Sequence, residues 1–303
     1  MSLIPFDDRD GEIWLDGALV PWREASVHVL SHGLHYASAV FEGERVYAGE
    51  IFELTAHSER LINSARILDF EIPYSAGQID QACRDAVAAM EITDGYVRPV
   101  AWRGSEMMGV SAQKNAIHLA IAAWEWPAYF SPEARMQGIR MQLSKWKRPS
   151  PETAPVHSKA AGLYMICTLS KHAAEKAGYS DALMLDWRGR IAEATGANVF
   201  LVIDGKIHTP TPDCFLDGIT RRTVIGLAKK RGLEVVERAI MPEELEQAAE
   251  VFITGTAAEV TPVSEIDGRT FKVGKITTQL VEDYDNLVNR RDKRAAAARA
   301  SAA

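Results

Sequence analysis

Hydrophobic and polar residues alternate along the first fifty positions in a pattern that predicts short, paired strands. Residues 13–22 read IWLDGALVPW, and residues 39–52 read AVFEGERVYAGEIF. In each stretch a pair ending in glycine, Asp16-Gly17 or Ala48-Gly49, divides two short apolar runs. Residues of this kind suit the tight turn of a hairpin. Two β-hairpins are therefore predicted here.

The pattern then changes to a mixture of helices and strands. Ser75 and Gln78 have capping-box spacing at the start of the amphipathic stretch 78–90, which predicts a helix. Strands are predicted at 95–102, 116–126, 138–146, 181–195 (with a turn), 198–211 (a hairpin), 234–240 and 251–255. Helices are predicted at 160–177, 216–232 and 242–250. The predicted class is mixed α/β or α+β with largely antiparallel sheets.

Two domains of ordinary size fit a chain of 303 residues. We predict a smaller N-terminal α/β domain at 1–125, an interdomain loop at 126–136 and a larger C-terminal domain at 137–290. The last residues, 291–303, have low complexity and are predicted to be disordered.

Composition narrows the functional class. The formal net charge of −7 argues against a general nucleic-acid binder. No apolar run approaches the roughly 18 residues of a membrane helix, and the acidic start does not read as a signal peptide. The cysteines at 83, 167 and 214 are far apart and odd in number, which predicts free thiols in a cytoplasmic protein.

Two charged residues lie among unusually small neighbours. Lys159 precedes Ala160, Ala161 and Gly162, and Glu193 lies in the stretch EATG. Solvent-exposed side chains are the commoner explanation for either residue. The alternative is that small neighbours leave room beside the amine, and beside the carboxylate, for a flat ligand.

Two short turns could bind an anion. DGIT (217–220) begins a predicted helix, and TGTAAE (254–259) follows a predicted strand. Free N–H groups at a helix N-terminus bind phosphate well, although each turn alone could be an ordinary connection. A lysine amine, a carboxylate and a phosphate site together suit pyridoxal phosphate.

A competing site lies in the stretch HVLSHGLHY. His28, His32 and His35 have helical spacing that could bind a metal, so a metal-dependent hydrolase is a remote alternative. Gly33 weakens a helix there, and local hydrogen bonds to the histidines are the simpler interpretation. Aromatic residues near predicted strand ends could form a pocket or belong to the core.

Taken together, these motifs resemble the fold-type IV pyridoxal-phosphate enzymes, and most closely the bacterial branched-chain amino-acid aminotransferases, from about Ile13 to about Asn286. The stretches that carry the resemblance are VHVLSHGLHYASAVFEGERVY, GYVRPVAW, SKAAGLY, EATGANVF, DGITRRTV and FITGTAAEVTPV. The resemblance implies a two-domain architecture with the cofactor at the domain interface and bound mainly by the C-terminal domain.

The resemblance also implies roles for individual residues. Lys159 matches the Schiff-base lysine, Glu193 the partner of the pyridine nitrogen, and Tyr164 the partner of the phenolic oxygen. The remaining implied cofactor contacts are Arg60, Gly218, Ile219, Thr220 and Thr256 around the phosphate and Leu216 on the ring.

For the substrate, the resemblance implies an α-carboxylate site and an apolar side-chain pocket. Its residues would be Tyr36, Phe41, Tyr96, Arg98, Trp126, Tyr129, Tyr164, Thr256 and Ala257, and Arg98 would meet the distal carboxylate of glutamate. Met107 and Met108, in the loop 104–110, would reach the pocket of a neighbouring subunit. A homodimer, or a larger oligomer built from dimers, is therefore expected.

The expected activity is transfer of the amino group of leucine, isoleucine or valine to 2-oxoglutarate, giving branched-chain 2-oxo acids and glutamate. The alternatives on the same fold are (R)-amine transaminase, D-amino-acid transaminase and aminodeoxychorismate lyase. Glu44 and His157 depart from the family pattern, and Glu44 leaves the polarity of the pocket open.

Overall fold

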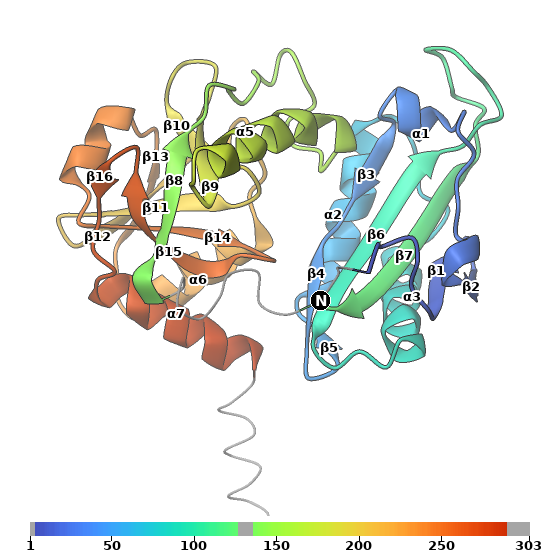
Figure 1. Ribbon diagram of the computed structural model, residues 1–303, viewed down its shortest axis with the longest axis horizontal. Coiled ribbons are helices and arrows are strands. Elements are labelled where there is room, and N and C mark those ends of the chain that lie inside the picture. The colour runs from blue at the N-terminus through green and yellow to red at the C-terminus, as the bar shows by residue number, and fades with distance from the viewer. Residues whose placement is uncertain (1–3, 127–135, 290–303) are drawn as a thin grey trace, which may run out of the picture. The chain divides into compact units, whose positions relative to one another are not determined.

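The structure, a computed structural model, describes residues 4–126 and 136–289 (Figure 1). The chain divides into two compact units. The N-terminal unit comprises Met1–Pro127 and Pro155–Tyr164, and the C-terminal unit comprises Ala128–Ala154 and Met165–Ala303. The stretch 155–164, which the sequence pattern assigned to the C-terminal domain, thus groups with the N-terminal unit. Most of the predicted interdomain loop and nearly all of the predicted tail lie outside the described residues.

The N-terminal unit is built on a seven-stranded antiparallel sheet with the order β2-β1-β7-β6-β4-β5, and β3 pairs with β6 (Figure 1). Its strands are β1 (Glu12–Leu15), β2 (Ala18–Pro21), β3 (Ala39–Phe41), β4 (Glu44–Tyr47), β5 (Glu50–Ile51), β6 (Gly95–Arg103) and β7 (Ile117–Glu125). Its helices are α1 (His32–His35), α2 (Leu54–Ile67) and α3 (Ala76–Ala89), with 3₁₀ turns at Trp22–Glu24 and Ala161–Tyr164.

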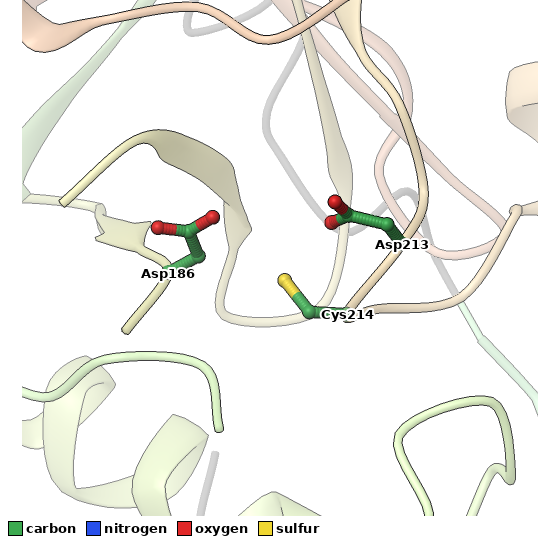
Figure 2. A group of neighbouring side chains, drawn as sticks. All are labelled: Asp186, Asp213 and Cys214. Carbon is green, nitrogen blue, oxygen red and sulfur yellow. The ribbon is translucent and has the colours of Figure 1, made fainter. Parts of the chain in front are cut away.

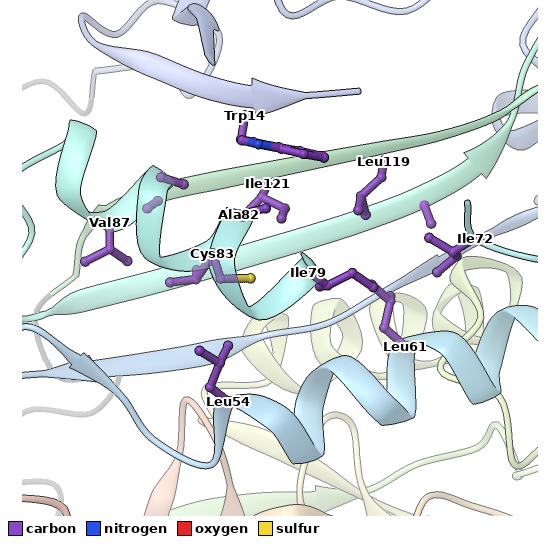
Figure 3. Packing of buried hydrophobic residues seen from close by; sticks show 14 of the residues in the cluster. Trp14, Leu54, Leu61, Ile72, Ile79, Ala82, Cys83, Val87, Leu119 and Ile121 are labelled. Atoms are coloured by element: carbon purple, nitrogen blue, oxygen red, sulfur yellow. The ribbon is translucent and has the colours of Figure 1, made fainter. Parts of the chain in front are cut away.

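Helices α2 and α3 pack on one face of this sheet and form its core (Figure 3). Leu119 and Ile121 alternate along β7 toward the helices and are fully buried with Leu61 of α2 and Ile79 of α3. The predicted capping box begins α3, since the Gln78 N–H donates to Ser75 Oγ and the Ser75 N–H donates to the Gln78 side chain.

The C-terminal unit is built on a nine-stranded mixed sheet with the order β10-β9-β8-β15-β14-β11-β12-β13, and β16 pairs with β15. Because β10 also pairs with β11, the run from β10 to β11 closes on itself. The strands are β8 (Ile139–Leu143), β9 (Asp181–Leu185), β10 (Ile191–Ala194), β11 (Asn198–Ile203), β12 (Lys206–Pro210), β13 (Val235–Arg238), β14 (Glu250–Gly255), β15 (Glu259–Ile266) and β16 (Arg269–Thr270). The helices are α5 (Met165–Lys176), α6 (Ile219–Lys230) and α7 (Lys275–Val288), with a 3₁₀ turn at Pro242–Gln247.

The mixed α/β class predicted from the sequence is confirmed, and so are the hairpins. At each predicted turn both residues have positive φ, for example 47° at Asp16 and 106° at Gly17. Helix α6 ends before Gly232, whose φ of 75° suits the residue after a helix. The helix predicted at 242–250 is wrong, because that segment forms only the 3₁₀ turn before β14 begins at Glu250. No helix in the described ranges is long and apolar enough to cross a membrane.

Glu44 lies in the core of the N-terminal unit. Its side chain is fully buried on β4, and neither carboxylate oxygen has a hydrogen-bond partner among the described residues. Burial, together with the negative charges of Glu42 and Asp80, raises the pKa of Glu44 well above its ordinary value, while the Cys83 thiol acts weakly in the opposite direction. Burial therefore favours the protonated form of Glu44 over the carboxylate in the folded chain.

We predict that Glu44→Gln makes the stability of the protein less dependent on pH. In the unfolded chain Glu44 ionises above its ordinary pKa of 4.5, whereas the folded chain keeps it protonated. Folding is therefore unpenalised at low pH and loses stability as the pH rises toward the elevated folded pKa. The free energy of unfolding should favour the variant over wild type by more at pH 8 than at pH 5, because only wild type must keep protonated a group that the unfolded chain ionises.

Urea unfolding at both pH values measures this difference. Glu59→Gln, at an exposed position of α2, is the matched control and should follow wild type at both pH values. Equal pH dependence in wild type and Glu44→Gln would contradict the assignment of a neutral, buried acid.

Candidate active site

The backbone of Lys159 is fixed within the N-terminal unit. The Lys159 N–H donates to Ser64 Oγ at 3.0 Å, and the Phe41 N–H donates to the Lys159 carbonyl at 3.2 Å. Ser158 Oγ donates to the Ser64 carbonyl at 2.9 Å. Contacts to the end of α2 and to β3 therefore hold the lysine.

The Lys159 side chain lies between two aromatic rings. Its Nζ donates to Tyr164 Oη at 2.8 Å and lies 4.9 Å from the centre of the Phe41 ring. Burial lowers the pKa of Lys159 to about 8; Glu42 opposes this change, and Arg60 and Arg98 add to it. A substantial fraction of the amine is therefore neutral near pH 7 to 8, so it can act as a nucleophile or a base.

Arg60 lies in the same unit and is paired with a carboxylate. Its Nε and Nη2 donate to the two oxygens of Glu42 at 2.6 and 2.8 Å. His57, one helical turn earlier on α2, also contacts Glu42, with 2.7 Å between its Nδ1 and Oε2. Neither Glu42 nor His57 was singled out from the sequence, although the spacing of His57 and Arg60 places them on one helix face.

Tyr96 and Arg98 extend this group along β6. Arg98 Nη2 donates to Tyr96 Oη at 3.2 Å, and the guanidinium lies 4.8 Å from the centre of the Phe41 ring. Arg98 forms no ion pair with a described carboxylate, so it does not pair with Glu44. Gly43 is required here, because a Cβ atom would lie 1.8 Å from Tyr96 Oη. The Trp126 ring lies beside Tyr96 with 5.0 Å between ring centres, and the two rings are tilted by 41°.

Tyr36, Met107 and Met108, which were also predicted for the pocket, are exposed in the described part of the chain. The Tyr36 ring stacks on His32 at 4.6 Å and is 45% exposed, and none of its ring contacts is to Phe41 or Tyr164. Tyr129 lies outside the described residues. Met107 and Met108 are exposed in the loop 104–110. Asn115 holds this loop through the carbonyls of Gly104 and Met107 and the N–H of Met107.

Backbone groups bind the histidines of the competing metal site. His28 Nδ1 accepts the Leu30 N–H at 3.1 Å, His32 Nε2 contacts the Gly109 carbonyl at 2.9 Å, and His35 Nε2 contacts the Leu30 carbonyl at 3.3 Å. Within the described ranges, the three histidines do not form a group with metal-binding geometry. The structure therefore favours the local hydrogen bonds over a metal face.

One group of potential metal ligands does occur in the described residues, at Asp186, Asp213 and Cys214 (Figure 2). Arg188 already pairs with both aspartates, at 2.6 and 2.7 Å. The N–H groups of Arg188 and Arg190 also donate to Asp186 Oδ1. The aspartates are thus neutralised by an arginine, and the group is a stabilised turn.

Glu193 lies on β10 of the C-terminal unit and is paired with a buried arginine. Arg148 Nε lies 3.2 Å from Glu193 Oε1, and the Glu193 side chain is only 13% exposed. Arg148 Nη1 also contacts Cys167 Sγ at 3.5 Å. The sequence pattern did not reveal Arg148, which offsets the cost of burying the carboxylate.

The two predicted anion-binding turns lie at the same end of the C-terminal sheet as Glu193. Glu193 pairs with Asn198 of β11, and Asn198 pairs with Thr254 of β14, just before the turn that contains Thr256 and Ala257. The Asn198 amide donates to the Leu216 carbonyl at 3.0 Å. Asn198 therefore links the strand ends to the start of α6.

Helix α6 begins with N–H groups, at Ile219 and Thr220, that have no hydrogen-bond partner among the described residues. Its N-cap is Gly218, which supplies no side-chain cap, and the first intrahelical bond runs from Arg222 to the Gly218 carbonyl. A Cβ atom on Gly218 would lie 2.3 Å from Asn198 Oδ1, so glycine permits the close approach of the two segments. The N–H groups of Ile219 and Thr220 are suited to an anion such as phosphate.

Comparison with known proteins agrees with this chemistry. Residues 39–266 match the family described as Amino-transferase class IV. The branched-chain-amino-acid aminotransferase of Pseudomonas aeruginosa is 43% identical over 93% of this chain and 94% of that protein. The chain therefore belongs to the class IV aminotransferases.

Two solved structures illustrate the likeness in fold. The branched-chain aminotransferase of Thermoproteus uzoniensis with norvaline has a TM-score of 0.89 and 37% identity, covering 93% of this chain and 96% of that one. The T.th. branched-chain amino acid aminotransferase complexed with N-(5'-phosphopyridoxyl)-L-glutamate has a TM-score of 0.89 and 40% identity, covering 93% and 95%.

Proposed function

We propose that this protein is a pyridoxal-phosphate transaminase that moves the amino group of leucine, isoleucine or valine to 2-oxoglutarate. The observation that carries the proposal is the partly buried Lys159 side chain, with its pKa lowered to about 8 and its Nζ 2.8 Å from Tyr164 Oη. The related structures with norvaline and with phosphopyridoxyl-glutamate support both halves of the exchange.

The described residues fit the cofactor's chemistry. Arg60 keeps Nη1 free of hydrogen bonds to described residues and, with the uncapped start of α6 and the Thr256 turn, would bind the phosphate. Glu193 would pair with the protonated pyridine nitrogen, Tyr164 would bind the phenolic oxygen, and Leu216 would pack on the ring. When bound, the cofactor supplies an electron sink for the substrate's α-carbon.

Lys159 performs the proton transfers. Its neutral amine would hold the cofactor and, once released from it, would accept at Nζ the proton of the substrate's α-carbon and give that proton up again in the second transfer. Tyr164 holds Nζ through the 2.8 Å hydrogen bond and so orients it. Burial keeps the amine from being fully protonated at neutral pH.

The proposed substrate pocket combines apolar rings with one cation. Phe41, Tyr96 and Trp126 provide apolar surface, and we propose the same role for Tyr36 and Tyr129. Tyr96, with the backbone of Thr256 and Ala257, would bind the α-carboxylate. Arg98 lies over Phe41 without a carboxylate partner among the described residues, so it can receive the distal carboxylate of glutamate.

The alternatives on the same fold, (R)-amine transaminase and D-amino-acid transaminase, are less well supported, because the relatives are branched-chain enzymes. The hydrogen-bonded histidines give the metal-dependent hydrolase no support. We further propose a cytoplasmic location, since Cys83, Cys167 and Cys214 are buried and form no disulfide among the described residues.

Arg98→Leu tests the substrate assignment. Glutamate and 2-oxoglutarate should lose roughly 2–4 kcal/mol in kcat/KM, the scale of a buried charge left without a partner. Leucine and its 2-oxo acid should lose about 1 kcal/mol or less, because they offer the guanidinium no partner. Single-turnover absorbance with each amino acid measures the two half-reactions separately.

Arg98→Lys is the matched control, since it keeps the charge and loses the two-pronged geometry, and it should fall between wild type and Arg98→Leu. Equal losses for leucine and glutamate, with a drop in stability, would show instead that Arg98 supports the strand and would remove its role in substrate choice.

We also propose that the protein forms a homodimer, or a larger oligomer built from dimers, through an apolar surface of the N-terminal unit. This surface comprises the exposed residues Val27, Val29, Leu30, Leu34, Tyr36, Met107, Met108 and Val110. Beside it lies a cavity of about 290 Å³, lined mainly by apolar residues that include Ile13, Val27, Leu34 and Trp102. Exposed apolar clusters of this kind mark association sites.

The His32 N–H donates to the Gly104 carbonyl, so α1 and the loop 104–110 adjoin. We propose that this loop places Met107 and Met108 against the substrate pocket of the neighbouring subunit. Association would therefore contribute directly to substrate binding.

Met108→Asp should dissociate the oligomer, because a charge buried at an interface without a partner costs several kcal/mol. Sedimentation velocity should show a shift toward monomer together with lower affinity for leucine. Leu287→Asp, at a 40% exposed position on α7, is the matched control and should associate like wild type. A wild-type protein that sediments as a monomer would refute the proposed oligomer.

A further inference from the structure

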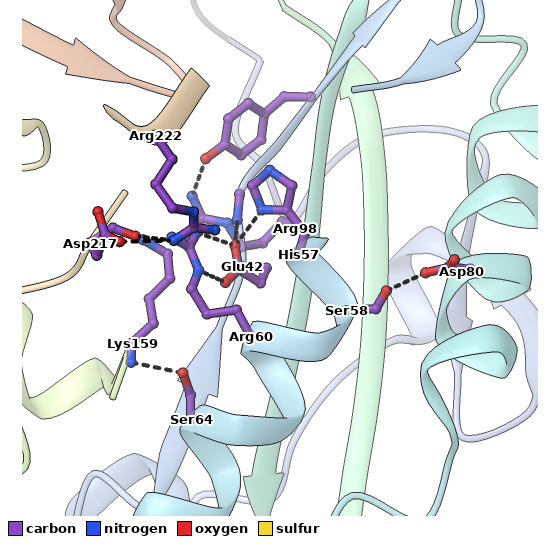
Figure 4. A network of polar contacts seen from close by, with 12 residues as sticks. Glu42, His57, Ser58, Arg60, Ser64, Asp80, Arg98, Lys159, Asp217 and Arg222 are labelled. Atoms are coloured by element: carbon purple, nitrogen blue, oxygen red, sulfur yellow. Dashed lines mark hydrogen bonds and ion pairs between the residues drawn. The ribbon is translucent and has the colours of Figure 1, made fainter. Parts of the chain in front are cut away.

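Glu42 is the most completely bonded carboxylate near Lys159. It lies between β3 and β4, its side chain is fully buried, and its N–H donates to the Pro99 carbonyl at 2.8 Å. Its oxygens accept hydrogen bonds from Arg60 Nε and Nη2, from His57 Nδ1 at 2.7 Å and from the Gly43 N–H at 3.3 Å (Figure 4). The carboxylate is therefore held rigidly.

The charges in this cluster can be assigned. Burial opposes ionisation of Glu42, but the charge and hydrogen bonds of Arg60, with the hydrogen bond of His57, hold the pKa of Glu42 below its ordinary value. Burial lowers the pKa of His57, so its ring is neutral and donates Nδ1–H to Glu42. One carboxylate thus faces one guanidinium, with a neutral histidine fixing the carboxylate from the other side.

The ion pair with Glu42 uses two of the three guanidinium nitrogens of Arg60 and leaves the third available to a ligand. Nε and Nη2 point to Glu42, while Nη1 bonds to no described residue. The Arg60 side chain is 16% exposed, whereas that of Glu42 is completely buried. A guanidinium is planar, so fixing two of its nitrogens fixes the direction of the third.

We propose that Glu42 is a positioning residue that fixes Arg60 in the one orientation in which Nη1 meets the cofactor's phosphate. This inference rests on the proposed function, in which Arg60 binds that phosphate. Glu42 does not touch the phosphate and acts only through Arg60. The simpler view is that the pair merely ties β4 to α2, and the two views differ in what they predict for ligands with and without a phosphate.

Pyridoxal, which lacks the phosphate, separates the two views. We would measure the dissociation constants of pyridoxal phosphate and of pyridoxal with the cofactor-free protein, by the visible absorbance that develops on binding. The ratio of the two constants reports the contribution of the phosphate alone. Effects of a variant on folding, or on Lys159, change both ligands and largely cancel in the ratio.

Glu42→Gln and Arg60→Met should each reduce the preference for pyridoxal phosphate over pyridoxal by roughly tenfold or more, the scale of one charge-assisted hydrogen bond. The double variant should reduce it no further than Arg60→Met, because both residues act through one contact. Asp80→Asn is the matched control. Asp80 is also a buried carboxylate that binds α2, through Thr55 and Ser58, and its removal should leave the preference unchanged.

Glu42→Asp provides a second variant should Glu42→Gln fail to fold. It keeps the charge but is one methylene shorter, so it cannot bind both Arg60 nitrogens in the same place, and the preference should fall by a smaller factor. If Arg60→Met lowers the preference while neither Glu42 variant does, Glu42 is only a structural tie and the inference is wrong. If Arg60→Met leaves the preference unchanged, Arg60 does not bind the phosphate, and that part of the proposed function fails with it.

Discussion

The structure depends most on how the N-terminal unit accommodates three neighbouring cations, Arg60, Arg98 and Lys159. Arg98 and Lys159 lie over the Phe41 ring, and Arg60 pairs with Glu42, the carboxylate on which this group relies. Removal from water disfavours each of these charges, and the nearness of the other cations adds to the effect. Arginine stays protonated in proteins, so neither Arg60 nor Arg98 can relieve the repulsion by losing a proton. Lys159 can, and its pKa falls to about 8. The reactivity of Lys159 is thus a consequence of its burial and its neighbours.

In the C-terminal unit the charged group removed from water is a carboxylate, and a neighbouring residue of opposite charge stabilises it. Glu193 is buried on β10 and is compensated by Arg148, which also contacts Cys167. Asn198 aligns this carboxylate with the ends of β11 and β14 and holds the segment that leads to the uncapped start of α6. Each unit therefore fixes its polar groups through its own backbone before any ligand binds, which lowers the entropic cost of binding.

Features that depend on neighbouring residues in the sequence could be predicted, whereas features that depend on contacts between distant parts of the chain could not. The turns at Asp16-Gly17 and Asp204-Gly205, and the capping box at Ser75, rest on neighbouring residues and were predicted correctly. The contact between Lys159 and Ser64 joins residues far apart in the chain, so its place in the N-terminal unit could not be seen. The register of β4 places Glu44 beside Asp80 and Cys83 of α3, and no local pattern reveals that choice. Helix α2, which is rich in polar residues, was also missed, and with it the pairing of His57 and Arg60 with Glu42.

The central claim is that burial among cations makes Lys159 the reactive amine. Cofactor-free protein would be mixed with pyridoxal phosphate across a pH series, reduced with borohydride at timed intervals and mapped by mass spectrometry of its peptides. The account predicts label on the peptide that contains Lys159, at a rate that rises with pH and levels off above a pKa of about 8. Label on other lysines, or a rate that keeps rising toward the ordinary lysine pKa of 10.5, would contradict it.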